Sequence, residues 1–157
     1  MIKIATLGII THGSRVLLGR RQGGSNIGEG KLTGPGGKLK TGETPFDCIL
    51  REVEEEVGLK PDKRFVRKCA VITFYSGGEA DYEVHVYRIP RFTGEPRETK
   101  EMKPSWHYIE HLPFGRMFES DRRWFPLLIK GWEFNAEVYY ERSGEGFLDF
   151  KRLPFVG

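Results

Sequence analysis

Cysteine is scarce in this sequence, and long apolar runs are missing from it. The chain has two cysteines, Cys48 and Cys69, among 157 residues, and their spacing fits neither a zinc site nor a disulfide framework. Reduced thiols in a cytoplasmic protein are therefore expected. The N-terminus at residues 1–4 has no apolar run long enough for a signal peptide. The apolar stretch at residues 125–129 is far too short to cross a bilayer. We expect no membrane association.

The sequence also lacks internal repeats, low-complexity tracts and linker-like segments, so we expect a single domain over residues 1–157. Hydrophobic residues make up 38% of the chain and aromatic residues 13%, which is enough apolar material for a core and excludes a disordered or collagen-like chain. A formal net charge of +3 is weak support for nucleic-acid binding. We expect a monomer without a nucleic-acid partner.

The charges are unevenly distributed along the chain. Residues 41–60 contain six acidic side chains and only Arg51 and Lys60 as basic ones, a local charge of −4 that leaves +7 for the other residues. An acidic cluster inside a basic chain indicates either a cation site or the solvated face of a helix.

Strand-like and helix-like segments alternate in a way that favours an α+β fold. A glycine-rich loop is expected at residues 22–30, and residues 33–37 form a tight segment where the backbone must approach another group closely. A second helix is expected at 121–130, with Pro126 near its first turn. Strands are predicted at residues 2–11, 16–18, 65–75 and 82–89, around Trp106, and at 133–140 and 147–151, the last two joined by a turn at 143–144.

The acidic segment has the start and stop signals of a helix. Thr44 can cap its N-terminus, Pro45 suits the first helical position and Gly58 can end it. The apolar residues share one stripe: Phe46, Ile49, Leu50, Val53 and Val57. Three carboxylates share the neighbouring stripe: Glu52, Glu55 and Glu56.

The order of residues around this helix separates the two interpretations of the acidic cluster. The order is Gly37, five residues, Glu43, seven residues, Arg51-Glu52-Val53, then Glu55-Glu56 and Gly58-Leu59. This is the complete Nudix box, and the chain resembles the Nudix hydrolase family. Carboxylates at helix positions i, i+3 and i+4 can present oxygens to one cation, and hydrolysis of a di- or triphosphate requires divalent cations that neutralise its charge. A solvated helix without a role would not need the glycine and the upstream Glu43 in register.

The resemblance implies an α/β/α sandwich with a mixed, curved sheet, a catalytic helix and a second, C-terminal helix. It implies Mg²⁺ as cofactor, with Mn²⁺ as the other candidate ion. The implied metal ligands are the Gly37 carbonyl, Glu52, Glu55, Glu56 and the loop residue Glu101. Arg51 is implied to pair with Glu43 and orient the catalytic helix, and Glu56 or a metal-bound neighbour is the expected base. Lys38 and Arg21 are candidate phosphate contacts.

Similarity outside the box extends to the human-type 8-oxo-dGTP diphosphatases, the MutT homologues. The matching segments are residues 15–19, 34–38, 84–86, 101–106, Met117 and 124–128. The base pocket departs from that subfamily, which has Asn at Thr33, Trp at Phe118 and acids at both Ser120 and Asp121. Phe118 can still stack on a base, and Asp121 can accept from a purine or instead cap the second helix. Tyr75 and Tyr82 either line this pocket or belong to the core.

The favoured function is Mg²⁺-dependent hydrolysis of purine nucleoside triphosphates, 8-oxo-dGTP or related oxidised purines, to the monophosphate and pyrophosphate. One alternative is a Nudix hydrolase acting on a nucleotide sugar, ADP-ribose or a dinucleotide. Another is a nucleotide-binding regulatory module without catalysis, although no acidic residue of the box is missing.

Overall fold

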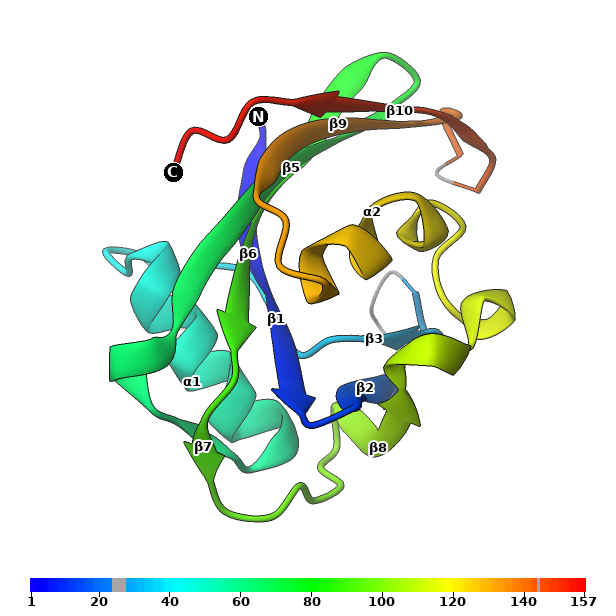
Figure 1. Cartoon of the computed structure of the whole chain (residues 1–157). Coiled ribbons are helices and arrows are strands. Elements are labelled where there is room, and N and C mark those ends of the chain that lie inside the picture. The colour runs from blue at the N-terminus through cyan, green and yellow to red at the C-terminus, as the bar shows by residue number, and fades with distance from the viewer. Residues whose placement is uncertain (24–27, 144) are drawn as a thin grey trace.

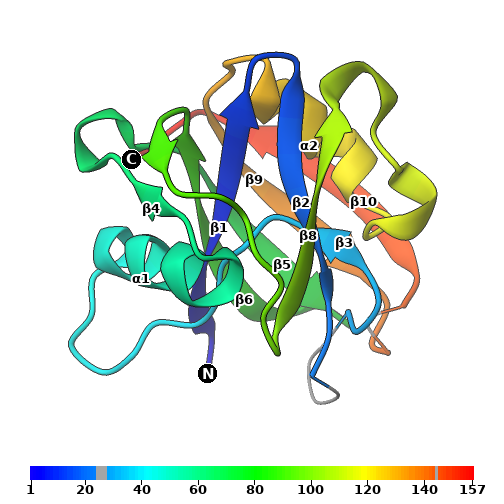
Figure 2. The same ribbon diagram turned by 90° about the horizontal axis from the view of Figure 1, so that it is seen from below.

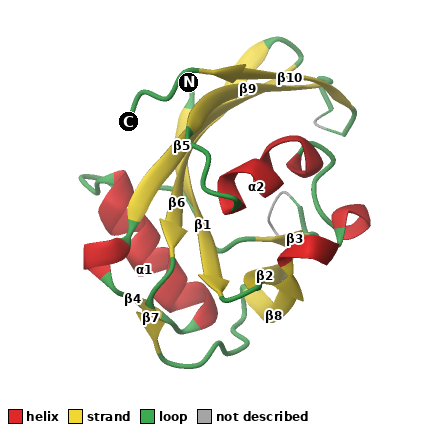
Figure 3. Ribbon diagram, in the orientation of Figure 1, coloured by secondary structure: helices red, strands yellow, loops and turns green. Residues whose placement is uncertain are grey.

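The computed structural model describes residues 1–23, 28–143 and 145–157. Part of the predicted loop at 22–30 and Gly144 of the predicted turn therefore lie outside the described residues. The predicted mixed sheet and two main helices are confirmed (Figures 1 and 3). Among the described residues, no helix has the length and apolarity needed to cross a membrane.

Five strands form the larger part of the sheet in the order β10-β9-β5-β6-β1. They are β1 (Lys3–His12), β5 (Arg67–Ser76), β6 (Glu79–Ile89), β9 (Phe134–Tyr140) and β10 (Phe147–Leu153). The β1–β6 and β5–β9 pairs are parallel, whereas β5–β6 and β9–β10 are antiparallel. Each parallel pair joins strands that are far apart in the sequence, because parallel neighbours require a long crossover connection.

A fork in the sheet begins at the hairpin of β1 and β2 (Arg15–Arg21). The two strands pair only at Thr11↔Val16 and His12↔Arg15, after which β2 diverges and pairs with β8 (Met102–Tyr108) and the short β3 (Leu32–Thr33). A separate two-stranded ladder joins β4 (Lys60–Pro61) to β7 (Phe92–Thr93). Figure 2 shows β1 and β2 running apart from their common turn.

Helix α1 (Pro45–Val57) begins and ends as its sequence signals predict. The Thr44 hydroxyl accepts from the Asp47 N–H, Pro45 occupies the first turn, and Gly58 ends the helix with φ 75°. Helix α2 (Asp121–Ile129) contains Pro126 in its interior rather than at its start. Three 3₁₀ turns, Lys63–Phe65, Ile109–His111 and Phe114–Arg116, complete the helical segments of the described chain. The first of these delays the start of β5 to Arg67, two residues after the predicted strand start.

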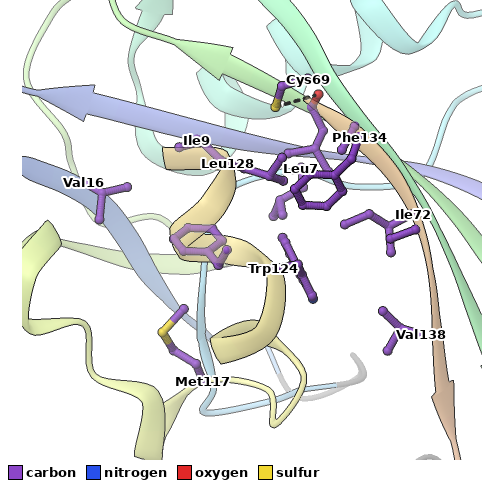
Figure 4. Close-up of a cluster of buried hydrophobic side chains, with 14 of the residues drawn as sticks. Leu7, Ile9, Val16, Cys69, Ile72, Met117, Trp124, Leu128, Phe134 and Val138 are labelled. Carbon is purple, nitrogen blue, oxygen red and sulfur yellow. Dashed lines mark hydrogen bonds between the residues drawn. The ribbon is translucent and has the colours of Figure 1, made fainter. Parts of the chain in front are cut away.

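The two helices cover opposite faces of the sheet, and each face has its own apolar cluster (Figure 1). The α2 side contains Leu7, Ile72, Trp124, Phe125 and Val138 among others, and Figure 4 shows Trp124 of α2 pointing toward this cluster. The α1 side contains Ile10, Leu17, Ile49, Val53, Tyr87 and Met102 among others. Both predicted free thiols, Cys48 and Cys69, are buried.

Candidate metal and nucleotide site

Two of the three predicted helix carboxylates lie beside the buried face of α1. Glu52 and Glu56 are 9% and 1% exposed, because their stripe borders the apolar residues that pack on the sheet. Glu55 is exposed, and its carboxylate receives a 3.1 Å hydrogen bond from Arg51. The structure therefore does not bring Glu55 into the same group as Glu52 and Glu56. One turn of helix separates those two, whereas Glu55 is rotated toward solvent.

The tight segment at residues 33–37, the glycine segment, lies between α1 and the edge of β1. The Thr6 N–H donates to the Gly37 carbonyl at 2.9 Å, and the Gly8 N–H donates to the Pro35 carbonyl at 2.7 Å. The N–H of Gly36 in turn donates to Glu56 Oε1 at 2.9 Å. A Cβ on Gly37 would lie 2.7 Å from the carboxyl carbon of Glu52, so a larger residue would force this carboxylate to move.

A third carboxylate reaches the same place from a loop. Carboxylate oxygens of Glu52, Glu56 and Glu101 all lie within 4.8 Å of one another. Oxygen atoms from several carboxylates are the ligands that Mg²⁺ and Mn²⁺ prefer in proteins. The group formed by these three residues, the carboxylate triad, therefore fits a divalent cation by the chemistry and number of its donors.

The electrostatics of the triad also favour a cation. Burial raises the pKa of Glu56 to about 8, although the charge of Arg21 and the Gly36 N–H oppose the rise. Burial likewise raises the pKa of Glu52, and the charges of Glu55 and Glu101 add to the rise, while hydrogen bonding and charge from Arg51 oppose it. Like charges gathered in a partly desolvated site repel one another until a cation neutralises them.

The expected ion pair between Arg51 and Glu43 is present. Arg51 Nε and Nη2 donate to the two oxygens of Glu43 at 2.7 and 2.9 Å, and Nη1 donates to Glu52 at 2.6 Å. The guanidinium lowers the pKa of Glu43 to about 2. Arg51 thus joins Glu43, in the loop before α1, to Glu52 of the triad.

The two predicted phosphate contacts lie in different environments. Arg21 Nη1 is 3.4 Å from Glu56 Oε2, and its Nη2 donates to the Gly36 carbonyl at 3.1 Å. Lys38 has an exposed side chain directly after the glycine segment. Arg21 therefore contacts a carboxylate of the triad in this structure, and Lys38 is exposed to solvent.

Three of the residues predicted for the base pocket, Phe118, Asp121 and Thr33, lie just before or at the start of α2 and on β3. Gly28 lies against the ring of Phe118, which a Cβ at position 28 would strike. Phe118 is three residues before the start of α2. Asp121 is buried and is the first residue of α2, whose N-cap is Ser120. The helix-capping alternative for Asp121 is therefore wrong. Ser120 is fully buried, its N–H donating to Tyr140 and its hydroxyl accepting from Trp124. Thr33 lies on β3 opposite Gly19.

The two predicted pocket tyrosines lie on opposite faces of the sheet. Tyr82 is paired with Phe74, whose ring contacts Trp124 of α2, so Tyr82 is on the α2 side. Tyr75 follows Phe74 and points the other way, stacked on Tyr139 with 4.7 Å between ring centroids. Strand alternation therefore directs Tyr75 away from Phe118 and Asp121, toward the Tyr139 side of the sheet.

Sequence reasoning missed two polar residues that hold the loop of Glu101. Thr99 and Gln22 hydrogen-bond to the backbone of this loop and of α1. The signal available in the sequence was weak: a threonine two positions before Glu101 and a glutamine directly after Arg21.

Comparisons with known proteins agree with this geometry. The NUDIX domain family matches residues 1–128. The chain is 40% identical over 155 residues to the oxidized purine nucleoside triphosphate hydrolase of Danio rerio, covering 98% of this chain and 96% of that protein. It is 35% identical over 140 residues to the Mus musculus protein of the same name, covering 88% and 87%.

A solved structure gives independent support for the fold. The Mutator MutT protein of Bacillus halodurans superposes with a TM-score of 0.82 at 18% identity, covering 96% of this chain and 97% of that one. Since the family match at residues 1–128 includes the glycine segment, α1 and Glu101, the chain belongs to the NUDIX domain family.

Proposed function

We propose that this protein hydrolyses purine nucleoside triphosphates, including oxidised ones such as 8-oxo-dGTP, to the monophosphate and pyrophosphate, and so removes damaged nucleotides from the pool. The observation that carries the proposal is the carboxylate triad beside the glycine segment. It stands in a chain that resembles, over nearly all its length, a hydrolase named for oxidized purine triphosphates.

Magnesium is the proposed cofactor, with manganese as the other candidate. Glu52, Glu56 and Glu101 would hold the ion. The Gly37 carbonyl, which accepts from the Thr6 N–H in this structure, is the further donor that the family resemblance implies. Glu55, one helical turn from Arg51, would bind the ion from the solvent-exposed side of the site. When bound, such an ion neutralises phosphate charge and lowers the pKa of a coordinated water.

The chain's own residues supply orientation and proton transfer in this proposal. Water adds across a P–O–P bridge, so one phosphorus–oxygen bond forms and another breaks, and a base must take a proton from the water. Glu56, held by the Gly36 N–H, is the proposed base. Arg21 and Lys38 would contact the phosphates. The ion pair of Arg51 with Glu43 would hold α1 in its orientation relative to the preceding loop.

Phe118, Asp121, Thr33 and Tyr82 are the proposed base contacts. Asp121 is the buried polar group with most to offer a purine edge, because its neighbour Ser120 already uses its hydroxyl and N–H within the protein. Tyr75 would contribute only indirectly, through the strand that also carries Phe74. We further propose that the enzyme acts as a cytoplasmic monomer on free nucleotides, without nucleic acid.

A substrate panel with Mg²⁺ tests the function. The expected result is turnover of 8-oxo-dGTP or another purine triphosphate, loss of turnover in Glu56→Gln, and wild-type rates in Glu54→Gln, the exposed matched control on the same helix. Turnover of ADP-ribose or a nucleotide sugar without turnover of any triphosphate would favour the other hydrolase classes. Nucleotide binding without turnover of any compound would favour a regulatory module.

A further inference from the structure

The loop that carries Glu101 raises a positioning problem. Glu52 and Glu56 belong to a helix packed on the sheet, whereas Glu101 is an exposed residue in the connection between β7 and β8. A carboxylate on an unconstrained loop would lose conformational entropy on binding an ion, which weakens affinity. Contacts that hold the loop in place before the ion arrives would remove this cost.

The Thr99 hydroxyl makes such contacts. It donates to the main-chain carbonyl of Glu56 at 2.8 Å and accepts from the main-chain N–H of Glu101 at 3.3 Å. A hydroxyl has one donor and two acceptor positions, so both bonds can form together. A single side-chain atom therefore joins the backbones of two members of the triad, one on the helix and one on the loop.

Gln22 holds the same loop from the end of β2. Its Nε2 donates to the Thr99 carbonyl at 2.8 Å and to Glu98 at 3.0 Å, and its N–H donates to the Glu101 carbonyl at 3.0 Å. The loop is thus fixed between α1 and β2, and the contacts with Thr99 span 77 residues of sequence.

We infer that Thr99 is a positioning residue of the metal site, setting the distance between Glu101 and Glu56, with Gln22 as the second clamp. This inference rests on the proposed function for the identity of the site. The competing explanation is that Thr99 only satisfies a carbonyl in the last turn of α1, where helical partners are missing. That role would affect folding stability and leave metal affinity unchanged in a folded protein.

A double-mutant cycle on nucleotide-free protein separates these explanations, with Mn²⁺ affinity measured by titration calorimetry. Thr99→Val removes the hydroxyl at nearly constant shape and is expected to weaken Mn²⁺ binding about 10-fold or more, as losses of supporting contacts around metal ligands do. Thr99→Ser keeps the hydroxyl and is expected to restore affinity. Thr93→Val, at an exposed threonine of β7, is the matched control.

The cycle is completed in Glu101→Gln. If Thr99 acts through Glu101, Thr99→Val should weaken Mn²⁺ binding no further in that background. Equal weakening in both backgrounds, failure of Thr99→Ser to restore affinity, or a lower melting temperature with unchanged Mn²⁺ affinity overturns the inference. If Thr99→Val does not fold, Gln22→Met, which removes the clamp on the Thr99 carbonyl, takes its place in the same cycle and is judged by the same outcomes.

The outcome is distinguishable from failure of the proposed function. Mn²⁺ affinity is measured without nucleotide, so an enzyme that binds the ion but turns over no triphosphate contradicts the function and leaves the positioning role standing. Wild-type turnover of a triphosphate together with an unchanged Mn²⁺ affinity in Thr99→Val contradicts the positioning role alone.

Discussion

Asp121 should make the folding stability of this protein depend on pH. Burial raises the pKa of Asp121 from its ordinary 3.8 to about 8, and a backbone hydrogen bond from Phe118 and the charge of Lys31 oppose the rise without cancelling it. The unfolded chain releases this proton near pH 4 and the folded chain near pH 8. Between these values the folded state binds more protons, so stability falls as the pH rises.

The Asp121→Asn variant isolates this contribution, because an amide of nearly the same shape does not ionise. At about 1.4 kcal/mol per pH unit, the free energy of unfolding of the wild type should fall relative to the variant by about 4 kcal/mol between pH 5 and pH 8. Above pH 8 the loss relative to the variant should level off, and below pH 4 the two stability curves should run parallel.

Urea denaturation of both proteins across this pH range measures the difference directly. Asp81→Asn, at an exposed position of β6, controls for the simple loss of a carboxylate charge. Parallel stability curves for wild type and Asp121→Asn would refute the reasoning, since a buried carboxyl that ionises as easily as an exposed one gives the variant no pH-dependent advantage.

Three further predictions concern the metal site. Gly37→Ala places its Cβ 2.7 Å from the carboxyl carbon of Glu52, so Mn²⁺ affinity measured by calorimetry should fall about 10-fold or more with little change in melting temperature. Gly115→Ala, whose Cβ meets nothing within 4 Å, is its control, and equal affinities in the two variants would contradict the steric argument. Arg51→Lys loses the two-pronged contact with Glu43 and should destabilise the fold by about 1 to 3 kcal/mol. Since the pKa of Glu43 is lowered from 4.5 to about 2, that loss should be full above pH 4.5 and shrink as the pH falls toward 2, which acid titration of both proteins checks. Chelation with EDTA should abolish triphosphate hydrolysis and added Mg²⁺ should restore it; activity that persists in EDTA would exclude the metal-dependent scheme.

Local spacing predicted the helix and the grouping of Glu52 with Glu56, because residues four apart on a helix share a face whatever surrounds them. It also placed Glu55 on that stripe, whereas the structure leaves Glu55 exposed. The ends of α1 at Thr44 and Gly58 follow from the same local rules. The contacts of Thr99 and Gln22 could not be predicted this way, since their partners are brought together only by the paths of β2 and the loop before β8.

Strand faces were predicted less well than helix faces. In residues 82–89, Val84 and Val86 alternate with Glu83, His85 and Tyr87, a pattern typical of a strand with one buried side. Tyr87 is nevertheless buried as well, because α1 covers the face that this pattern leaves to solvent. Tyr75 shows the complementary error: its aromatic ring fits a base pocket by chemistry, but its strand directs it to the Tyr139 side. Covering helices and strand direction are tertiary properties, which composition does not encode.

The fork at β1 ties the length of the β1–β2 hairpin to the position of the glycine segment, residues 33–37. One edge of β1 pairs with β6 from Lys3 to Ile10, and the other edge pairs with β2 at only two residue pairs, Thr11↔Val16 and His12↔Arg15. The glycine segment occupies the earlier part of that second edge, through Thr6, Gly8 and the bridge from Ala5 to Lys38. Extending the β1–β2 ladder toward the start of β1 would saturate the same hydrogen-bonding groups and displace the segment. In this fold, a longer β1–β2 ladder and the glycine segment beside the carboxylate triad compete for one strand edge, so the candidate metal site depends on a short hairpin.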